Sequence, residues 1–413
     1  MGPLEGIKVV DFSRVLAGPH CAQTLQDLGA EVIKIEPPSG DLSRMALPRR
    51  GEISGYYAQQ NAGKRNISID LNLPGAREIA LRLCEQADVV VENFRPGTLA
   101  WFGLSYEDVA ARNPAIVYAS ISGYGQHGAW RARSAYAPTV QAETGITAMS
   151  GKHWGTGGAT RTDSLSHADV YSGLHAAIAI LAALTERGRT GRGQYIDVAM
   201  AAVMLSMNER VHVDLSDEEI GDEVPILGAT DCAFFIDPEG NEFVSPMSLV
   251  GSLSFQLYLM AMRRPDLATD PRFATASDRL RNLDALREII QSWIWTFGDS
   301  ASLNAQLDEA KIATGRVRGI RDIATSDWAS EWGAIRTVDD GDGGTIPVPG
   351  RPWHFGSTPG ATGGEAAGEG TTEKRRWAAR QGQHNEEILR ELGYGDEDIA
   401  ALEKLGVLVC RSG

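Results

Sequence analysis

The fold of this chain is decided by the stretch IKVVDFSRVLAGPHCAQTLQDLGAEVIKIE, residues 7–36. Residues 7–13 are apolar enough for a buried strand, residues 21–28 favour a helix, and residues 31–36 form a second strand-like run. A strand, a helix and a second strand in immediate succession indicate a βαβ unit, in which the two strands are parallel. We therefore expect a parallel sheet at the start of the chain.

The alternation of strand and helix patterns continues after this unit. Further strands are predicted at residues 65–71, 88–94 and 115–122, and helices lie between them at residues 74–86 and 106–112. The first part of the chain thus has five strands that alternate with helices. This pattern is typical of a doubly wound, Rossmann-like α/β fold with a parallel sheet.

Helical patterns become more frequent after residue 138. The Ala-rich segment 168–187 predicts a long helix, and residues 191–200 predict a tight turn into a further strand. An acidic stretch, 214–223, indicates a domain boundary, and the mixture of short strands and helices beyond it predicts a second, α+β domain. Residues 339–372 are rich in glycine and proline, so we expect a surface loop there.

The composition is that of an ordinary globular protein. The chain has 413 residues, 43% of them hydrophobic, and a formal net charge of −15. Its first hundred residues hold 11 basic and 12 acidic side chains, so the excess negative charge lies in the remainder. This balance argues against a nucleic-acid partner but allows a local basic pocket for a small anionic ligand. Four cations at or near strand ends could meet a polyphosphate: Lys34, Lys64, Arg65 and Arg95.

Several classes of site are not indicated by the sequence. The four cysteines are far apart and form no CxxC pair, which argues against a zinc site or a disulfide framework and favours a reducing, cytoplasmic environment. The sequence contains no HExxH motif, P-loop or GxSxG elbow. Its longest apolar run is too short to span a bilayer, and its start does not resemble a signal peptide. We therefore expect no metal and no membrane anchor.

A possible dinucleotide-binding turn lies at residues 123–128, GYGQHG, which match the GxGxxG pattern and follow a predicted strand. Glu143 lies about twenty residues further on, as an acidic ribose ligand would. However, the next residues, AWRARSAY, do not form an apolar helix, and Glu143 lies in a helical stretch rather than at the end of a second strand. The context therefore disfavours a dinucleotide site.

Asp169 lies at the expected first turn of the long helix. The N-terminus of a helix is partly positive, and an aspartate there can accept backbone N–H bonds. Both effects lower the pKa of the carboxyl group, so we expect Asp169 to be ionised at pH 7. An ionised carboxylate can cap the helix or act as a nucleophile. The residues alone leave both roles open.

Ordered segments over nearly the whole chain resemble the class III CoA-transferase family, the carnitine dehydratase and bile-acid-inducible type. The matching segments are LEGIKVVDFSRVLAGP (4–19), LGAEVIKIEP (28–37), KRNISIDL (64–71), VENFRPG (91–97), SGYGQ (122–126), Ala168-Asp169 at the start of the Ala-rich helix, TGRGQ (190–194), RFA (272–274) with Arg279, and EILRELG (387–393). So many matches in one order are more specific than any single motif.

The resemblance implies an acyl-CoA:carboxylate CoA-transferase. In the family an aspartate, matched here by Asp169, attacks an acyl-CoA carbonyl to form a mixed anhydride and release CoA thiolate. The thiolate then forms an aspartyl-CoA thioester, and an acceptor carboxylate takes over the CoA by the reverse steps. The implied partners are an acyl-CoA and a carboxylic acid, and no tightly bound cofactor is implied.

The resemblance also implies an architecture. The family has a Rossmann-like large domain built from both chain ends, a smaller inserted domain, and two chains interlocked as a homodimer. On this basis we expect residues 1–213 to be the N-terminal part of a large CoA-binding domain, residues 224–330 to be the small domain, and residues 331–413 to complete the large one. Within this last segment, residues 385–405 are amphipathic and helical, with a break at residues 393–395.

The CoA site of the family maps onto nine residues of this chain: Arg14, Leu16, Ala17, Leu71, Asn72, Asn93, Phe94, Arg95 and Tyr136. Leu16 stands where formyl-CoA transferases have a Gln, and the glycine-rich flap of the oxalate enzymes has no counterpart after Asp214. These departures disfavour oxalate and formate as substrates. Trp101 replaces a basic CoA contact of some members.

Two other functions stay open. A 2-methylacyl-CoA racemase of the same family would need a His after the GYGQ segment and a Glu further along, but residues 134–138, SAYAP, and residues 244–256 supply neither. A protein that binds CoA thioesters without turnover is the second alternative, and the intact Asp169 argues against it.

Overall fold

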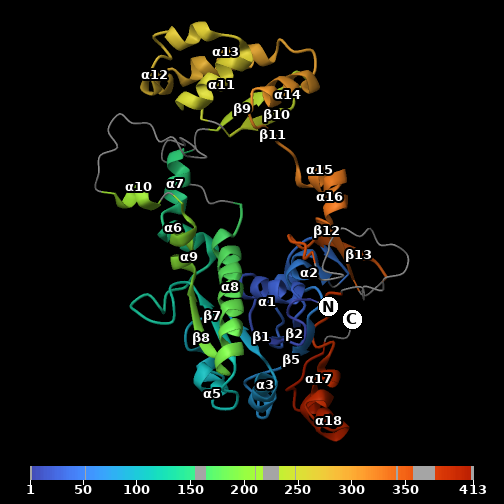
Figure 1. The fold of residues 1–413 in the computed structure, drawn as a ribbon. Coiled ribbons are helices and arrows are strands. Elements are labelled where there is room, and N and C mark those ends of the chain that lie inside the picture. Colours follow the sequence, from blue (N-terminus) through green and yellow to red (C-terminus); the bar gives the residue numbers. More distant parts are fainter. Residues whose placement is uncertain are drawn as a thin grey trace. The chain divides into compact units, whose positions relative to one another are not determined.

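The computed structural model describes residues 2–51, 53–153, 164–209, 211–216, 232–246, 248–340, 343–356 and 377–410. The chain divides into two compact units. The first unit is formed by residues 1–211 and 324–413, and the second by residues 212–323. The first unit is therefore completed by a segment that returns from far along the chain (Figure 1).

The first unit is built on a six-stranded parallel sheet (Figure 1). Its strands are β1 (Lys8–Asp11), β2 (Glu31–Glu36), β5 (Arg65–Ser68), β6 (Val89–Glu92), β7 (Val117–Ser122) and β8 (Gln194–Ala199). They lie in the order β5-β2-β1-β6-β7-β8, and every neighbouring pair is parallel. This is the strand order of the Rossmann fold. The predicted α/β fold with a large parallel sheet is confirmed.

Helices cover both faces of this sheet. The helices in the N-terminal part of this unit are α1 (Ala17–Asp27), η1 (Leu42–Met45), α2 (Gly55–Asn61), α3 (Ala76–Glu85), α4 (Thr98–Trp101), α5 (Tyr106–Ala110), α6 (Ala137–Glu143), α7 (Ile146–His153), α8 (His167–Thr190) and α9 (Met200–Met207). Successive strand side chains point to opposite faces. Val9 and Val89 therefore join one core with α1, α8 and α9, whereas their neighbours Val10 and Val90 join the other with α3 and α5.

Helix α1 begins at Ala17, earlier than the predicted start at Cys21. The sequence did not predict this start because Gly18 and Pro19 are both typical helix breakers. A proline is tolerated in the first turn because the backbone N–H it lacks would have no partner there. At Gly18 a Cβ atom would lie 2.1 Å from the Cβ atom of Ser13, so only glycine allows the chain to turn this tightly from β1 into α1.

Two small antiparallel pairs flank the sheet: β3 (Arg49–Arg50) with β4 (Ile53–Ser54), and β12 (Ile335–Asp339) with β13 (Thr345–Pro349). The loop predicted at residues 339–372 is therefore wrong where β13 lies. Ile346 and Val348 alternate with exposed residues and pack on Tyr57 of α2, a period-2 pattern that the neighbouring glycines and prolines obscured. Residues 341–342 and 357–372 of that stretch lie outside the described residues.

The C-terminal segment, residues 377–410, covers the β5 edge of the sheet with α17 (Asn385–Glu391) and α18 (Asp396–Lys404) (Figure 1). These helices are separated where the sequence predicted a break. Leu408 forms a β-bridge with Ile69, and the backbone N–H of Ser68 donates to the side-chain oxygen of Asn385 at 2.9 Å. The edge strand therefore gains hydrogen-bond partners from the other end of the chain.

The second unit is a small α+β structure. It contains β9 (Ala233–Ile236), β10 (Glu242–Ser245) and β11 (Gly315–Arg316) in an antiparallel sheet, with α11 (Ser252–Met262), η3 (Pro265–Thr269), α12 (Ala276–Arg281), α13 (Leu283–Ile294) and α14 (Ser300–Glu309). Its core is formed by residues of β9, β10 and the helices, including Phe235 and Phe273. Three short helices lie at or near the unit boundaries: α10 (Val211–Leu215), α15 (Ile320–Ala324) and α16 (Asp327–Trp332).

Candidate active site

The strand order of the sheet reverses between β1 and β6, because the chain moves outward from β1 to β2 and β5 and then returns to start β6 on the other side. In open α/β sheets, ligands bind at such a point, beyond the carboxyl ends of the strands. Here the loops after the two strands are joined. The backbone N–H of Arg14 donates to the side-chain oxygen of Asn93 at 2.8 Å, and the Asn93 amide donates to the Arg14 carbonyl at 2.9 Å.

A cavity of about 400 Å³ opens at this point, and we name it the Asp169 cavity. Eight of the ten residues predicted for the site line it: Arg14, Leu16, Ala17, Asn93, Phe94, Arg95, Tyr136 and Asp169. The other two, Leu71 and Asn72, line a second cavity of about 240 Å³. Arg14 and Phe94 line both cavities, so the structure brings all ten residues to one region. Their individual roles stay predictions.

Asp169 lies in the first turn of α8, and its position depends on how closely α8 packs on α1. One turn further along α8, Gly173 faces the start of α1, where a Cβ atom would lie 2.6 Å from the Ala17 carbonyl oxygen. Only glycine therefore allows this approach. Ser166 is the N-cap residue and makes no capping side-chain bond, so Asp169 is not the N-cap itself.

The pKa of Asp169 is raised to about 6, because burial removes water from the carboxylate. The backbone N–H of Ala137 donates to the carboxylate and opposes this shift. The expectation that the helix N-terminus lowers the pKa is therefore wrong: the effect of burial is the larger one. With a pKa near 6 the carboxylate is still mostly ionised at pH 7, and it is less stabilised by its surroundings than an exposed aspartate.

Four arginines line the Asp169 cavity: Arg14, Arg95, Arg131 and Arg133. Arg14 donates to the Gly40 carbonyl at 2.9 Å, and Arg95 donates to the Ser134 hydroxyl at 2.6 Å. Each guanidinium has five N–H donors, so these bonds leave donors for a ligand. The lining therefore has an excess of positive charge, although the chain as a whole is acidic. Such a cavity favours an anionic ligand.

Of the four cations expected to meet a polyphosphate, Arg95 alone lines the Asp169 cavity. Lys34 and Lys64 are buried, and their ammonium groups form ion pairs with Asp41 at 3.0 Å and Asp11 at 2.9 Å. Arg65, the first residue of β5, pairs with Glu31 of β2 and with Glu387 and Glu391 of α17. The expectation is wrong for these three residues, because acidic side chains of other elements neutralise them.

Three lining or neighbouring residues were not predicted from the sequence. Ser122 is buried at the end of β7, lines the cavity, and its hydroxyl has no hydrogen-bond partner among the described residues. Arg131 lines the cavity and makes no side-chain hydrogen bond or ion pair within the described part of the chain. Burial raises the pKa of the Tyr56 phenol on α2, and the nearby Asp169 carboxylate raises this pKa further. Ser122 belongs to the quoted SGYGQ segment, which was the available signal.

Other site types can be assessed only for the described residues. Within them, no group of three or more His, Cys, Asp or Glu side chains could hold a metal ion. All four cysteines are free. One helix of the described part, α8, is long and apolar enough to cross a membrane, but it packs on α1 and the sheet and contributes to their shared core. In a core helix such a composition is expected.

Comparison with known proteins identifies the family. The profile of CoA-transferase family III matches residues 4–368. The chain belongs to CoA-transferase family III. A formyl-CoA:oxalate CoA-transferase from Streptomyces coelicolor is 33% identical to this family III CoA-transferase, over 98% of the chain and 99% of the relative. A succinyl-CoA:mesaconate CoA-transferase from Haloarcula hispanica is 32% identical, over 96% of the chain and 98% of the relative.

A solved structure supports the same assignment. A CaiB/BaiF family protein from Brucella suis superposes on this family III CoA-transferase with a TM-score of 0.75 and 30% identity, over 95% of this chain and 99% of that one. A further relative, from Chloroflexus aurantiacus, is a succinyl-CoA–D-citramalate CoA-transferase with 31% identity over 98% of both chains. These relatives transfer CoA between different acids, so the family assignment establishes the type of reaction and leaves the acids open.

Proposed function

We propose that this enzyme transfers CoA from an acyl-CoA to a carboxylic acid through covalent intermediates on Asp169. The observation that carries the proposal is an aspartate with a destabilised carboxylate, in a cavity whose other charged lining residues are arginines. A carboxylate that is poorly solvated is a better nucleophile, and the surrounding cations favour binding of an anionic thioester.

The proposed steps keep one negative charge throughout. The Asp169 carboxylate attacks the thioester carbonyl, a C–O bond forms, the C–S bond breaks, and CoA leaves as the thiolate. The thiolate attacks the Asp169 carbonyl of the mixed anhydride, forming an aspartyl-CoA thioester and releasing the donor acid as its carboxylate. The acceptor carboxylate then attacks this thioester and expels the thiolate, which leaves a new anhydride. The thiolate attacks the acyl carbonyl of this anhydride, which forms the product acyl-CoA and releases Asp169 as its carboxylate.

Other residues of the cavity would bind and orient the reactants. The Ala137 N–H, which donates to the Asp169 carboxylate, would hold the Asp169 carbonyl oxygen when charge develops on it. Arg14, Arg95 and the loop residues Leu16 and Ala17 would hold CoA, with Arg95 on a phosphate. The buried side chain of Leu16 would favour an acceptor less polar than oxalate, which a screen of acyl-CoA donors against carboxylic acids can test.

Trapping of the covalent intermediate tests this proposal. We expect hydroxylamine, added during turnover, to convert the Asp169 side chain to a hydroxamate, which mass spectrometry of the Asp169 peptide detects. A Glu186→Ala variant, altered on the same helix outside the cavity, should show the same adduct. Loss of the α-hydrogen into solvent without CoA exchange would instead identify a racemase, and CoA binding without either reaction would identify a binding protein.

The interlocked homodimer stays a prediction from the family resemblance, and the cytoplasmic location stays a prediction from the cysteine pattern. A sedimentation mass of about 44 kDa would contradict the dimer. The proposal assigns CoA binding to the first unit, which contains all ten predicted residues.

A further inference from the structure

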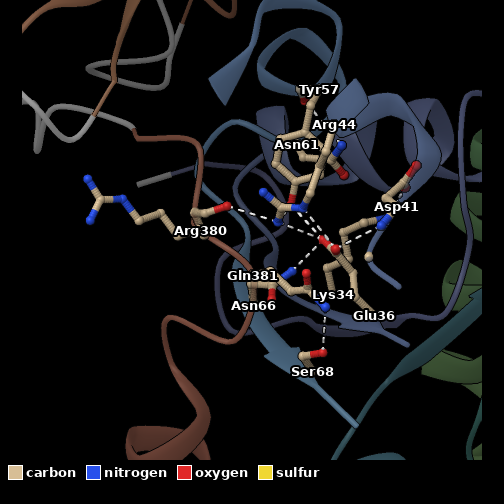
Figure 2. Close-up of polar contacts among 12 residues, drawn as sticks. Lys34, Glu36, Asp41, Arg44, Tyr57, Asn61, Asn66, Ser68, Arg380 and Gln381 are labelled. Carbon is tan, nitrogen blue, oxygen red and sulfur yellow. Dashed lines mark hydrogen bonds and ion pairs between the residues drawn. The ribbon is translucent and has the colours of Figure 1, made fainter. Parts of the chain in front are cut away.

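Four buried charges lie directly behind the loop that follows β1, and we call them the four-charge frame: Asp11, Lys34, Asp41 and Lys64. The side chains of Lys34 and Asp41 are fully buried, and those of Lys64 and Asp11 are 1% and 0% exposed. Figure 2 shows Lys34 extending toward Asp41, next to the Glu36–Arg44 pair, whose carboxylate also accepts the backbone N–H of Asp41 at 2.9 Å. Buried ion pairs are weak evidence for stability, because desolvation offsets much of their attraction. The frame therefore calls for another explanation.

Each charge of the frame also holds one main-chain group of residues 13–19. Asp11 accepts the Ser13 N–H at 2.9 Å, and the Lys34 ammonium donates to the Ser13 carbonyl at 2.7 Å. The Asp41 carboxylate accepts the Val15 N–H at 3.2 Å. The Lys64 ammonium donates to the Pro19 carbonyl at 3.0 Å. Both ends and the middle of the segment are thus fixed by charges from other elements.

The conformation of this segment needs such support. Val15 has a φ of +68°, in the left-handed region that a β-branched residue rarely adopts. Its neighbours Arg14, Leu16 and Ala17 all line the Asp169 cavity. Without the bond from Val15 to Asp41 we expect the segment to relax toward an extended form, which would turn these side chains out of the cavity.

We propose that Lys34 and Lys64, each with its aspartate partner, are positioning residues that set the loop 13–19 in the geometry that receives CoA. This inference rests on the proposed function, since it takes the ligand of the loop to be a CoA thioester. Neither lysine lines the Asp169 cavity, so both act through the main chain of the loop. Preorganised contacts of this kind raise affinity because the ligand does not have to order the loop on binding.

Two double variants test the frame without leaving a buried charge unpaired: Lys34→Met with Asp41→Asn, and Lys64→Met with Asp11→Asn. The matched control is Arg336→Met with Asp27→Asn, which removes a two-bond ion pair at 2.7 and 3.1 Å in the same unit. That pair has no hydrogen bond to residues 13–19 among the described residues. Binding of CoA is measured by calorimetry, stability by thermal unfolding, and turnover by the acyl-CoA dependence of the rate.

We expect the frame variants to raise the Kd of CoA and the KM of the acyl-CoA by about tenfold or more, with a smaller change in kcat. The control pair is more exposed than the frame, and we expect little change in the Kd of the control whatever thermal stability it loses. A frame variant that is folded and binds CoA as the control does would overturn the inference. If the Lys34→Met with Asp41→Asn variant does not fold, Asp41→Asn alone provides the test, because Asp11 still offsets the Lys34 charge. Its weaker, neutral acceptor for the Val15 N–H should still raise the Kd of CoA above that of the control, and an unchanged Kd would contradict the inference.

Binding is measured without turnover, so the two proposals can fail separately. A wild-type protein that binds CoA but forms no Asp169 adduct contradicts the transferase mechanism, while the Kd values of the frame variants still decide the positioning role. Conversely, normal Kd values in folded frame variants contradict the positioning role even if the Asp169 adduct is trapped.

Discussion

The four-charge frame and the Asp169 cavity contain the same kinds of charged side chain in one unit, but their charges are satisfied in opposite ways. In the frame each lysine has a carboxylate partner at 2.9 to 3.0 Å and a carbonyl of the chain, which leaves little capacity for a ligand. The Asp169 cavity is lined by four arginines and one aspartate, and among the described residues only Arg133 of these arginines forms an ion pair, with Glu143. Charges that the chain neutralises itself set geometry, whereas charges that it leaves in excess are available for binding and chemistry.

The largest effect is expected from removing the one acid of the cavity. Asp169→Ala should lower kcat by about 1,000-fold or more, because no other side chain can form the aspartyl intermediate. The Kd of CoA should change little, as the arginines remain. Steady-state CoA exchange and calorimetry check both points, with Glu186→Ala as the control. Normal exchange by Asp169→Ala would contradict the mechanism.

Substitution of a lysine in the four-charge frame should instead lower the stability of the fold. Lys64→Met leaves the Asp11 carboxylate buried without its main partner, so we expect the free energy of unfolding to fall by about 3 to 5 kcal/mol. Arg95→Met, at an exposed position of the cavity, should change it by less than about 0.5 kcal/mol. Urea unfolding of the two variants provides the measurement. Equal losses would show that the two regions do not differ as described.

Substitution of Arg95 should weaken the binding of CoA although it has little effect on the stability of the fold. We expect Arg95→Met to raise the Kd of CoA by about tenfold, the value of one charge-assisted hydrogen bond to a phosphate. The salt dependence of binding should also become weaker, since one cation is lost. Calorimetry at two ionic strengths tests this, with Arg82→Met on α3 as a control outside the cavity. An unchanged Kd would remove Arg95 from the phosphate site.

The pH dependence of turnover should report the raised pKa of Asp169. Below about pH 6 the carboxyl group is protonated and is no longer a nucleophile, so kcat/KM should fall about tenfold for each further pH unit. The arginines keep their charge over this range, so the Kd of CoA should change much less. Activity that is constant down to pH 5 would show that Asp169 titrates normally or is not the nucleophile.

The smallest expected effect is a gain in stability. Burial raises the pKa of Asp169 from 3.8 to about 6, so between these values the folded protein binds more protons than the unfolded chain, and its stability falls as pH rises. The free energy of unfolding of Asp169→Asn at pH 7 should therefore be about 1 kcal/mol higher than that of the wild type, allowing for partial exposure of the side chain. Urea unfolding should show the difference shrinking below pH 6 and disappearing below pH 3.8.

Much of the fold was predictable because it depends on local patterns. Apolar runs and the helices between them defined the parallel sheet, and the break at residues 393–395 separated the last two helices. The start of α1 was not predictable, since Gly18 and Pro19 discourage a helix unless the close approach of Ser13 is known. Strand β13 was hidden for a similar reason, because its partner α2 lies about 290 residues earlier in the chain.

The site was predictable as a set of residues but not in its electrostatics. The family resemblance named ten residues that the fold places around two adjoining cavities. The roles of Lys34 and Lys64 could not be inferred, because pairing with Asp41 and Asp11 depends on tertiary contacts. The pKa of Asp169 was predicted in the wrong direction for the same reason: the helix terminus is visible in the sequence, but the burial of the side chain is not.

The covering of β5 by residues 377–410 has a consequence for biosynthesis. Ser68 and its partner Asn385 are 317 residues apart, and ribosomes add about 5 to 20 residues per second, so this strand waits about 15 to 60 s for its cover. During that time the nascent chain presents an unpaired sheet edge, which is a site for wrong pairing with other chains. Correct closure of this edge therefore has to wait until the last helices have been synthesised.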